Sequence, residues 1–127
     1  MLVNNHDICL MPFKFEKLLV WQKALVLADE INELLKTFPN SETYVLGSQI
    51  KRAADSVSLN IIEGSTNQSV SEFKRFLRYA LRSALEVVGC IFLAKGRRYL
   101  DELMFKKIYA LCEEIVVMLN ALSRAVK

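Results

Sequence analysis

The sequence predicts an all-α protein, an antiparallel up-down-up-down four-helix bundle. Apolar residues recur at alternating three- and four-residue steps over four long segments, as they do on one face of a helix. The connections between these segments are short, which makes successive helices antiparallel neighbours. The 127 residues include only four glycines and two prolines, too few for the frequent turns of an all-β protein.

We expect a single bundle domain over residues 13–127, preceded by an N-terminal arm, residues 1–12. The run Met11-Pro12-Phe13-Lys14 resembles a natural start, so residues 1–10 are a candidate upstream extension. No apolar run approaches the roughly 18 residues of a membrane-spanning helix. The first 12 residues lack the basic start and cleavage site of a signal peptide. We therefore expect a cytoplasmic protein with no membrane partner.

The first two predicted helices cover residues 17–37 and 42–63. Pro39 ends the first and favours an extended Phe38, while Asn40 and Ser41 are candidate caps of the second. Gly64 is expected just past the end of the second helix. The apolar face of the first helix is predicted to consist of Trp21, Ala24, Leu25, Ala28, Ile31, Leu35 and Phe38, and that of the second of Leu46, Ile50, Ala53 and Val57.

The third predicted helix covers residues 70–95, and the fourth runs from Leu100 or Asp101 nearly to the C-terminus. Ser69 and Glu72 form a capping box at the start of the third, and Gly96 ends it. The third core face is predicted to be Phe73, Leu77, Ala80, Ala84, Val87, Ile91 and Ala94. The fourth is predicted to be Met104, Ile108, Leu111, Ile115, Met118, Leu122 and Ala125.

Further apolar residues lie beside two of these faces at seven-residue intervals. They are Val20, Leu27 and Leu34 on the first helix, and Phe105, Cys112, Leu119 and Val126 on the fourth. A helix facing a single core needs a narrower apolar stripe than this. We expect these second faces to be buried between copies of the chain in a cyclic homo-oligomer. A generous core with tolerated surface apolar residues is the alternative.

A polar stripe follows the core face of the second helix. It consists of Gln49, Arg52, Ser56, Asn60 and Glu63, with Ser83 and Glu86 as candidate partners on the third helix. Asn60 takes the next core position after Val57, where an amide is costly unless it is hydrogen-bonded. One interpretation is a structural network that sets the register of the helices. The other is a polar ligand site or active site in the centre of the bundle.

Basic residues cluster on the third helix. Lys74, Arg75, Arg78 and Arg82 lie within about 100° of one another around the helix axis. Lys51 and Arg52 extend this basic patch if the second helix is a neighbour. The patch is either a solvated face with ion-paired arginines or a surface that contacts phosphates of a nucleic acid. The net charge of +3 is too small to decide between these interpretations.

The sequence shows no catalytic constellation, so we expect no catalytic residues, no enzyme, no cofactor and no metal site. Cys9, Cys90 and Cys112 are too widely and irregularly spaced for a zinc site or a disulfide framework. His6 is the one histidine, and the Glu-x-x-His pairs of di-iron bundles are missing.

Several motifs agree in order and spacing with one known family. They begin with Phe15-Glu16-Lys17-Leu18, Val20-Trp21-Gln22-Lys23-Ala24, Phe38-Pro39, Glu42, Tyr44 and Leu46. They continue with Ser48-Gln49-Ile50-Lys51-Arg52-Ala53-Ala54, Ser56, Asn60-Ile61-Ile62-Glu63-Gly64, Glu72-Phe73, Arg75-Phe76-Leu77, Ser83 and Glu86. Over roughly residues 13–127 the chain thus resembles the four-helix-bundle proteins encoded in 23S rRNA intervening sequences. It departs from the family pattern at four positions. Arg82 stands where the family often has glycine, and Ile62 replaces a small alanine. Asn67 and Gln68 occupy a loop in which the family commonly has an arginine.

The resemblance implies a homopentameric ring of bundles with no established enzymatic activity. It also implies a relation to accessory variability proteins of diversity-generating retroelements, which bind nucleic acid and a reverse transcriptase. We therefore expect self-association and binding of RNA or a ribonucleoprotein through Lys51, Arg52, Lys74, Arg75, Arg78 and Arg82. A protein-interaction scaffold, such as a reverse-transcriptase accessory subunit that does not bind RNA directly, is the alternative. Gln49, Asn60, Glu63, Ser83 and Glu86 match the family motif and, with Ser56, are interpreted as structural.

Overall fold

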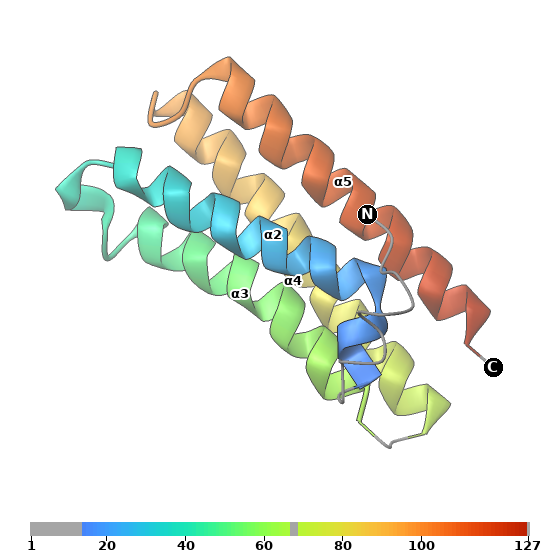
Figure 1. The fold of residues 1–127 in the computed structure, drawn as a ribbon. Coiled ribbons are helices and arrows are strands. Elements are labelled where there is room, and N and C mark those ends of the chain that lie inside the picture. The colour runs from blue at the N-terminus through green and yellow to red at the C-terminus, as the bar shows by residue number, and fades with distance from the viewer. Residues whose placement is uncertain (1–13, 67–68, 127) are drawn as a thin grey trace.

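The computed structural model describes residues 14–66 and 69–126, which form a bundle of four long helices (Figure 1). These are α2 (Leu19–Leu34), α3 (Leu46–Gly64), α4 (Val70–Gly96) and α5 (Glu102–Ala125). Three short 3-10 helices, η1 (Lys14–Lys17), η2 (Leu35–Thr37) and η3 (Asn40–Glu42), precede α2 and connect it to α3. The described residues contain no strand, so the predicted all-α class is confirmed. The predictions for the arm 1–12, His6, Cys9, Asn67 and Gln68 lie outside these residues.

Contacts across the bundle fix how neighbouring helices are aligned. Between α3 and α4, Gln49 bonds to Glu86 and Ser56 to Ser83, so residue numbers rise along one helix as they fall along the other. Ion pairs of Lys23 with Glu114 and of Lys107 with Glu30 show the same relation between α2 and α5. None of the helices in the described ranges is long and apolar enough to cross a membrane.

One hydrophobic core joins the four helices. On α3 and α4 the predicted core faces are confirmed, because Leu46, Ile50, Ala53, Val57, Leu77, Ala80, Ala84, Val87, Ile91 and Ala94 are all buried. Phe73 is partly buried against this core. After Val57 the next core position belongs to Ile61, whereas the predicted Asn60 lies on the flank and is half-buried.

The predicted core faces of α2 and α5 are confirmed in part. Ala24, Ile31, Ile108 and Ile115 are buried as predicted, but the remaining fully buried positions of these helices belong to the neighbouring set of apolar residues, one position earlier along α2 and one later along α5. The buried residues are Val20, Ala24, Leu27, Ile31 and Leu34 on α2, and Phe105, Ile108, Cys112, Ile115 and Leu119 on α5. Leu25 is 44% exposed, and Val126 is half-buried. On each helix, two adjacent columns of apolar residues run along the helix, and the members of one column are seven residues apart. The positions of the partner helices decide which column is fully buried. The supposed second faces therefore belong to the core of one chain, and they give no reason to expect self-association.

Glu42 organises the start of α3 in place of the predicted caps. Asn40 lies in η3, and no side chain caps the N-terminus of α3 at Val45. The Glu42 carboxylate accepts a hydrogen bond from the Leu46 amide at 3.3 Å and another from the Tyr99 hydroxyl at 3.1 Å. One acidic side chain thus links the α2–α3 connection to the α4–α5 connection. At the other predicted starts, Ser69 and Asp101 cap α4 and α5 by accepting from the amides of Glu72 and Met104.

Gly64 lies inside α3 and is required by close packing. A Cβ atom at this position would lie 2.8 Å from Cβ of Phe76 and 3.1 Å from Cδ1 of Phe73, both on α4. Its backbone has no positive φ, so the predicted role as a residue just past the helix end is wrong. The missing side chain lets the end of α3 approach α4 closely.

Arg98 provides the left-handed residue that ends α4, with φ at 63°. The Tyr99 amide donates to the Ala94 carbonyl at 2.9 Å, and the Arg98 amide donates to the Lys95 carbonyl at 3.0 Å. These two bonds form a Schellman motif, in which glycine usually takes the left-handed position. The predicted terminator, Gly96, is the last residue of α4 itself.

We predict that Gly64→Ala lowers the free energy of unfolding by about 1–3 kcal/mol, because the new methyl group overlaps Phe76. Chemical denaturation followed by circular dichroism measures this change. Gly96→Ala is the matched control: its Cβ would meet no atom within 4 Å, so a gain of about 0.5 kcal/mol is expected from helix propensity. Equal effects of the two substitutions would contradict close packing at Gly64.

We predict that Arg98→Gly raises the free energy of unfolding by about 0.5–1 kcal/mol, because glycine adopts a positive φ without steric cost. Arg98→Ala removes the same charge but keeps a Cβ atom, so it should bring no such gain. Thermal unfolding of both variants separates backbone strain from the loss of charge. A gain in both would assign the effect to the charge.

Candidate nucleic-acid interface

Small residues bring α3 and α4 together. Ala53 and Ala54 on α3, and Ala80 and Ala84 on α4, are each at most 3% exposed. Because these side chains are short, the two helices pack closely and their outer flanks form a continuous surface. The predicted polar stripe and the predicted basic patch both lie on these two helices.

Hydrogen bonds join the middle of the polar stripe across the two helices. Asn60 Nδ2 donates to the Ser56 carbonyl at 2.8 Å and to Ser56 Oγ at 2.9 Å. The hydroxyls of Ser56 and Ser83 share a bond of 2.9 Å, and Ser83 Oγ lies 3.1 Å from the Tyr79 carbonyl. These bonds satisfy the polar groups that flank the core, as a structural network requires.

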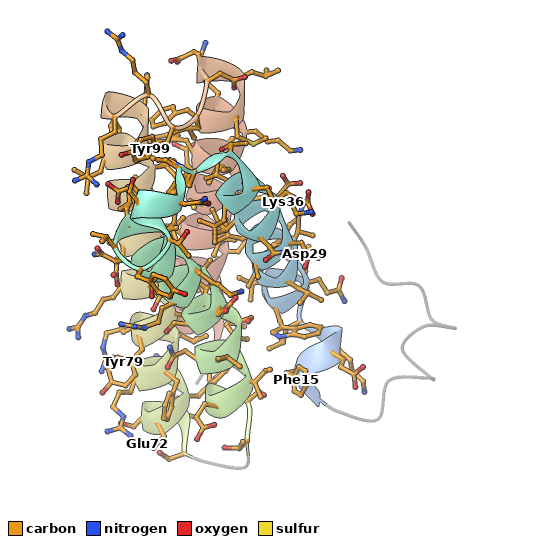
Figure 2. All side chains as sticks on the ribbon, turned by 90° about the vertical axis from the view of Figure 1, so that its left-hand side faces the viewer. Phe15, Asp29, Lys36, Glu72, Tyr79 and Tyr99 are labelled. Carbon is orange, nitrogen blue, oxygen red and sulfur yellow. The ribbon has the colours of Figure 1, made fainter. Side chains whose placement is uncertain are left out.

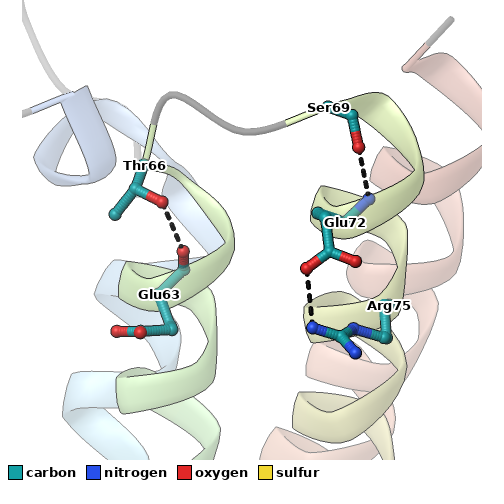
Figure 3. A network of polar contacts seen from close by, with 5 residues as sticks. All are labelled: Glu63, Thr66, Ser69, Glu72 and Arg75. Carbon is teal, nitrogen blue, oxygen red and sulfur yellow. Dashed lines mark hydrogen bonds and ion pairs between the residues drawn. The ribbon is translucent and has the colours of Figure 1, made fainter.

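The ends of the polar stripe face solvent. Gln49 Nε2 donates to Glu86 Oε2 at 3.4 Å, and both residues are exposed. Glu63 is also exposed, and Figure 3 shows its carboxylate pointing away from Arg75. The stripe therefore lies on the outer flank of α3 and α4. The interpretation as a ligand site or active site requires the stripe to lie in the bundle centre, where it does not lie. In the part of the chain that the structure describes, Ser58 is the one buried polar residue, and its hydroxyl donates to the Asp55 carbonyl.

Acidic neighbours neutralise two members of the basic patch. Arg75 Nη2 donates to Glu72 Oε2 at 2.6 Å, as Figure 3 shows. The Glu72 carboxylate was expected to complete the capping box at Ser69, but it binds this guanidinium. Lys51 Nζ lies 3.6 Å from Oδ2 of Asp55, which is one turn further along α3. These two cations are therefore less free to meet an external anion.

The remaining cations of the patch have no such partner. Arg52, Arg78 and Arg82 are exposed and Lys74 is half-buried. None of the four makes an ion pair within residues 14–66 and 69–126. Arginine presents several donors in a planar fork that suits phosphate oxygens, and an unpaired guanidinium keeps them all available. The structure thus leaves a free cationic surface on α4, with Arg52 added from α3.

Tyr79 belongs to this surface and was missed in the sequence. It is 36% exposed, and its ring packs edge-on against Phe76, with 5.6 Å between centroids and 89° between planes. The Arg75 guanidinium lies 5.8 Å from the centre of the Tyr79 ring. The sequence signal was the alternation of basic and aromatic residues between positions 74 and 82, which is typical of surfaces that bind single-stranded nucleic acid.

The described residues hold no cluster of three or more histidine, cysteine, aspartate or glutamate side chains that could bind a metal ion. Cys90 and Cys112 are free and buried. Burial raises the pKa of the Cys112 thiol to about 12, and burial with the nearby charge of Glu86 raises the pKa of Cys90. Both thiols are therefore protonated near neutral pH.

Comparison with known proteins identifies the family. A sequence model of the 23S rRNA-intervening sequence proteins matches residues 16–121. The chain belongs to this family. The chain is also similar to a protein of Bacteroides thetaiotaomicron VPI-5482 whose crystal structure is known. That protein has unknown function and comes from the S23 ribosomal protein family. The two chains share 28% sequence identity and superpose with a TM-score of 0.78, covering 84% of this chain and 100% of that one. The comparison with curated proteins found no match.

The family match confirms the resemblance that the motifs indicated. The matched residues include α3, α4, the polar stripe and the whole basic patch. Arg82 is one of the exposed cations without an ion-pair partner in the described ranges.

Proposed function

We propose that this intervening-sequence protein is a non-enzymatic, cytoplasmic homo-oligomer that binds RNA or a ribonucleoprotein through α3 and α4. One observation carries the proposal: Arg52, Arg78 and Arg82 are exposed, and none has an acidic partner among residues 14–66 and 69–126. Guanidinium groups without an acidic partner can donate to phosphate oxygens more readily than ion-paired ones. Lys74 adds a fourth cation at the edge of this surface.

The proposed oligomer is a homopentameric ring of up-down-up-down antiparallel bundles, as the family resemblance implies. Support from the molecule comes from apolar side chains on the outer side of α4 and α5. Leu85 is 53% exposed, Phe92 54% and Tyr109 39%, and the rings of Phe92 and Tyr109 lie 6.2 Å apart. Exposed apolar side chains of this size favour an interface between proteins. A ring would also repeat the cationic surface in every subunit, and each neutralised phosphate adds to affinity.

A second candidate function rests on the same apolar surface. Leu85, Phe92 and Tyr109 suit contact with another protein, such as a reverse transcriptase of which this chain would be an accessory subunit. In that case the arginines of α4 are a solvated face, and the chain itself does not bind RNA.

We predict that the double substitution Arg78→Gln and Arg82→Gln weakens binding of a mixed-sequence single-stranded RNA by about tenfold, because two phosphate contacts are lost. Fluorescence anisotropy at several salt concentrations measures both the affinity and its salt dependence. The slope of log affinity against log salt should fall by about 0.7 for each arginine removed.

The control for this experiment is the double substitution Lys106→Gln and Arg124→Gln, which removes the same charge from exposed positions on α5. This variant should bind RNA nearly as the unmodified protein does. Equal losses in the two variants would show a general charge effect and contradict a specific surface. If the unmodified protein binds no RNA, the proposal fails and the second candidate function takes its place.

We predict a solution mass of five times the 14.5 kDa chain, and a lighter species for Leu85→Glu, because a charge in an apolar interface is costly. Light scattering coupled to size-exclusion chromatography measures the mass. Val117→Glu is the control, since Val117 is 61% exposed on α5 outside the apolar group named above. A monomeric unmodified protein, or equal dissociation of both variants, would contradict the proposed interface.

A further inference from the structure

We infer that the cationic surface of α4 is built for single-stranded RNA, with one base stacking on the ring of Tyr79. The inference rests on the proposed function and names the form of RNA that the surface takes. It also assigns a role to Tyr79, the one exposed aromatic side chain within the stretch 74–82. Three properties of Tyr79 support this role: the position of its ring, the groups that hold it and the charges around it.

Tyr79 lies between the basic patch and the polar stripe. At about 100° per residue, its neighbours around α4 are Arg75 and Arg82 on one side and Ser83 on the other. The Ser56–Ser83 bond shows the register of the two helices, which brings Asn60 of α3 opposite Tyr79. Figure 2 shows Tyr79 at the outer edge of α4, where long side chains with nitrogen ends project into solvent. A base on this ring would therefore have cations beside its phosphates.

Contacts within the bundle hold the ring in place before any ligand arrives. Phe76 packs perpendicular to it at 5.6 Å between centroids, and the Arg75 guanidinium lies over one face of the ring, 5.8 Å from its centre, so a base would stack on the other face. Arg75 is fixed in turn by its 2.6 Å bond to Glu72. An aromatic side chain that is already ordered loses little conformational freedom on binding, so more of the stacking energy contributes to affinity.

The same features distinguish single strands from duplexes. Stacking on a side chain requires the face of a base, and in a duplex both faces are covered by neighbouring base pairs. Arg78 and Arg82 can contact the phosphates of either form, because phosphate contacts carry no such requirement. Charge alone therefore predicts binding of both forms, whereas Tyr79 adds a preference for the single strand.

Fluorescence anisotropy with two labelled probes tests the inference. One is a mixed-sequence RNA of about 12 nucleotides, and the other is the same strand annealed to its complement. We expect Tyr79→Ala to weaken binding of the single strand by about 5- to 100-fold and to leave duplex binding nearly unchanged. Tyr79→Phe should bind as the unmodified protein does, because the ring face remains.

Two further measurements separate stacking from charge and from folding. The salt dependence of single-strand binding should be the same in Tyr79→Ala as in the unmodified protein, because no phosphate contact is removed. Tyr79→Leu preserves an apolar contact for Phe76 but has no aromatic face, so it should lose affinity as the alanine variant does. Tyr44→Ala removes a tyrosine that is 91% exposed between η3 and α3, and should change nothing.

Equal weakening of both probes by Tyr79→Ala, or full affinity of Tyr79→Leu for the single strand, would overturn the inference. RNA binding that depends on Arg78 and Arg82 would then still support the proposed function. Absence of binding to either probe by the unmodified protein would instead overturn the proposed function itself, and the inference with it.

Discussion

The close approach of α3 and α4 governs the arrangement of most other features of the bundle. Both helices bury alanines, and at the end of α3 Gly64 leaves room for Phe76, to whose Cβ an added Cβ would come within 2.8 Å. Helices this close have a fixed rotation and register, because short side chains leave little space in which either helix can turn or slide. The hydrogen bond between Ser56 and Ser83 is a consequence of that register.

The proposed functional surface follows from the same contact. With their small residues turned inward, α3 and α4 place the polar stripe and the arginines of the basic patch on one continuous outer side. In the middle of the polar stripe, Asn60, Ser56 and Ser83 form hydrogen bonds with one another. Glu72 forms an ion pair with Arg75, and Arg75 packs against the Tyr79 ring. Arg78 and Arg82 are exposed and form no ion pair with any residue in the described ranges. Structural and proposed ligand-binding roles are thus divided among adjacent residues of α4.

Predictions from the sequence succeeded where one signal dominates. The core faces of α3 and α4 followed from one apolar stripe on each helix, and the cap at Ser69 followed from local chemistry. The start of α5 was predicted at Leu100 or Asp101, and the structure adds that Asp101 caps it. The predictions failed where two signals compete. On α2, the column of Val20 and Leu27 is as apolar as that of Trp21 and Ala28, and only contact with α3 and α5 selects the first. The prediction that Asn40 or Ser41 caps α3 failed for a related reason. Glu42 bonds to the first amide of α3 instead, and its carboxylate is held by the hydroxyl of Tyr99, which follows α4.

Residues close together along the chain are enough to establish the helical class, the ends of the helices to within a few residues, the family, and the clustering of cations on one face of α4. Contacts between distant residues, by contrast, select which apolar column of α2 and α5 is buried and which cations are neutralised. They also make Tyr79 an ordered, exposed ring beside the free arginines. Periodicity along a single helix carries no information about the side chains that its neighbours bring, so these properties emerge only when the four helices pack together.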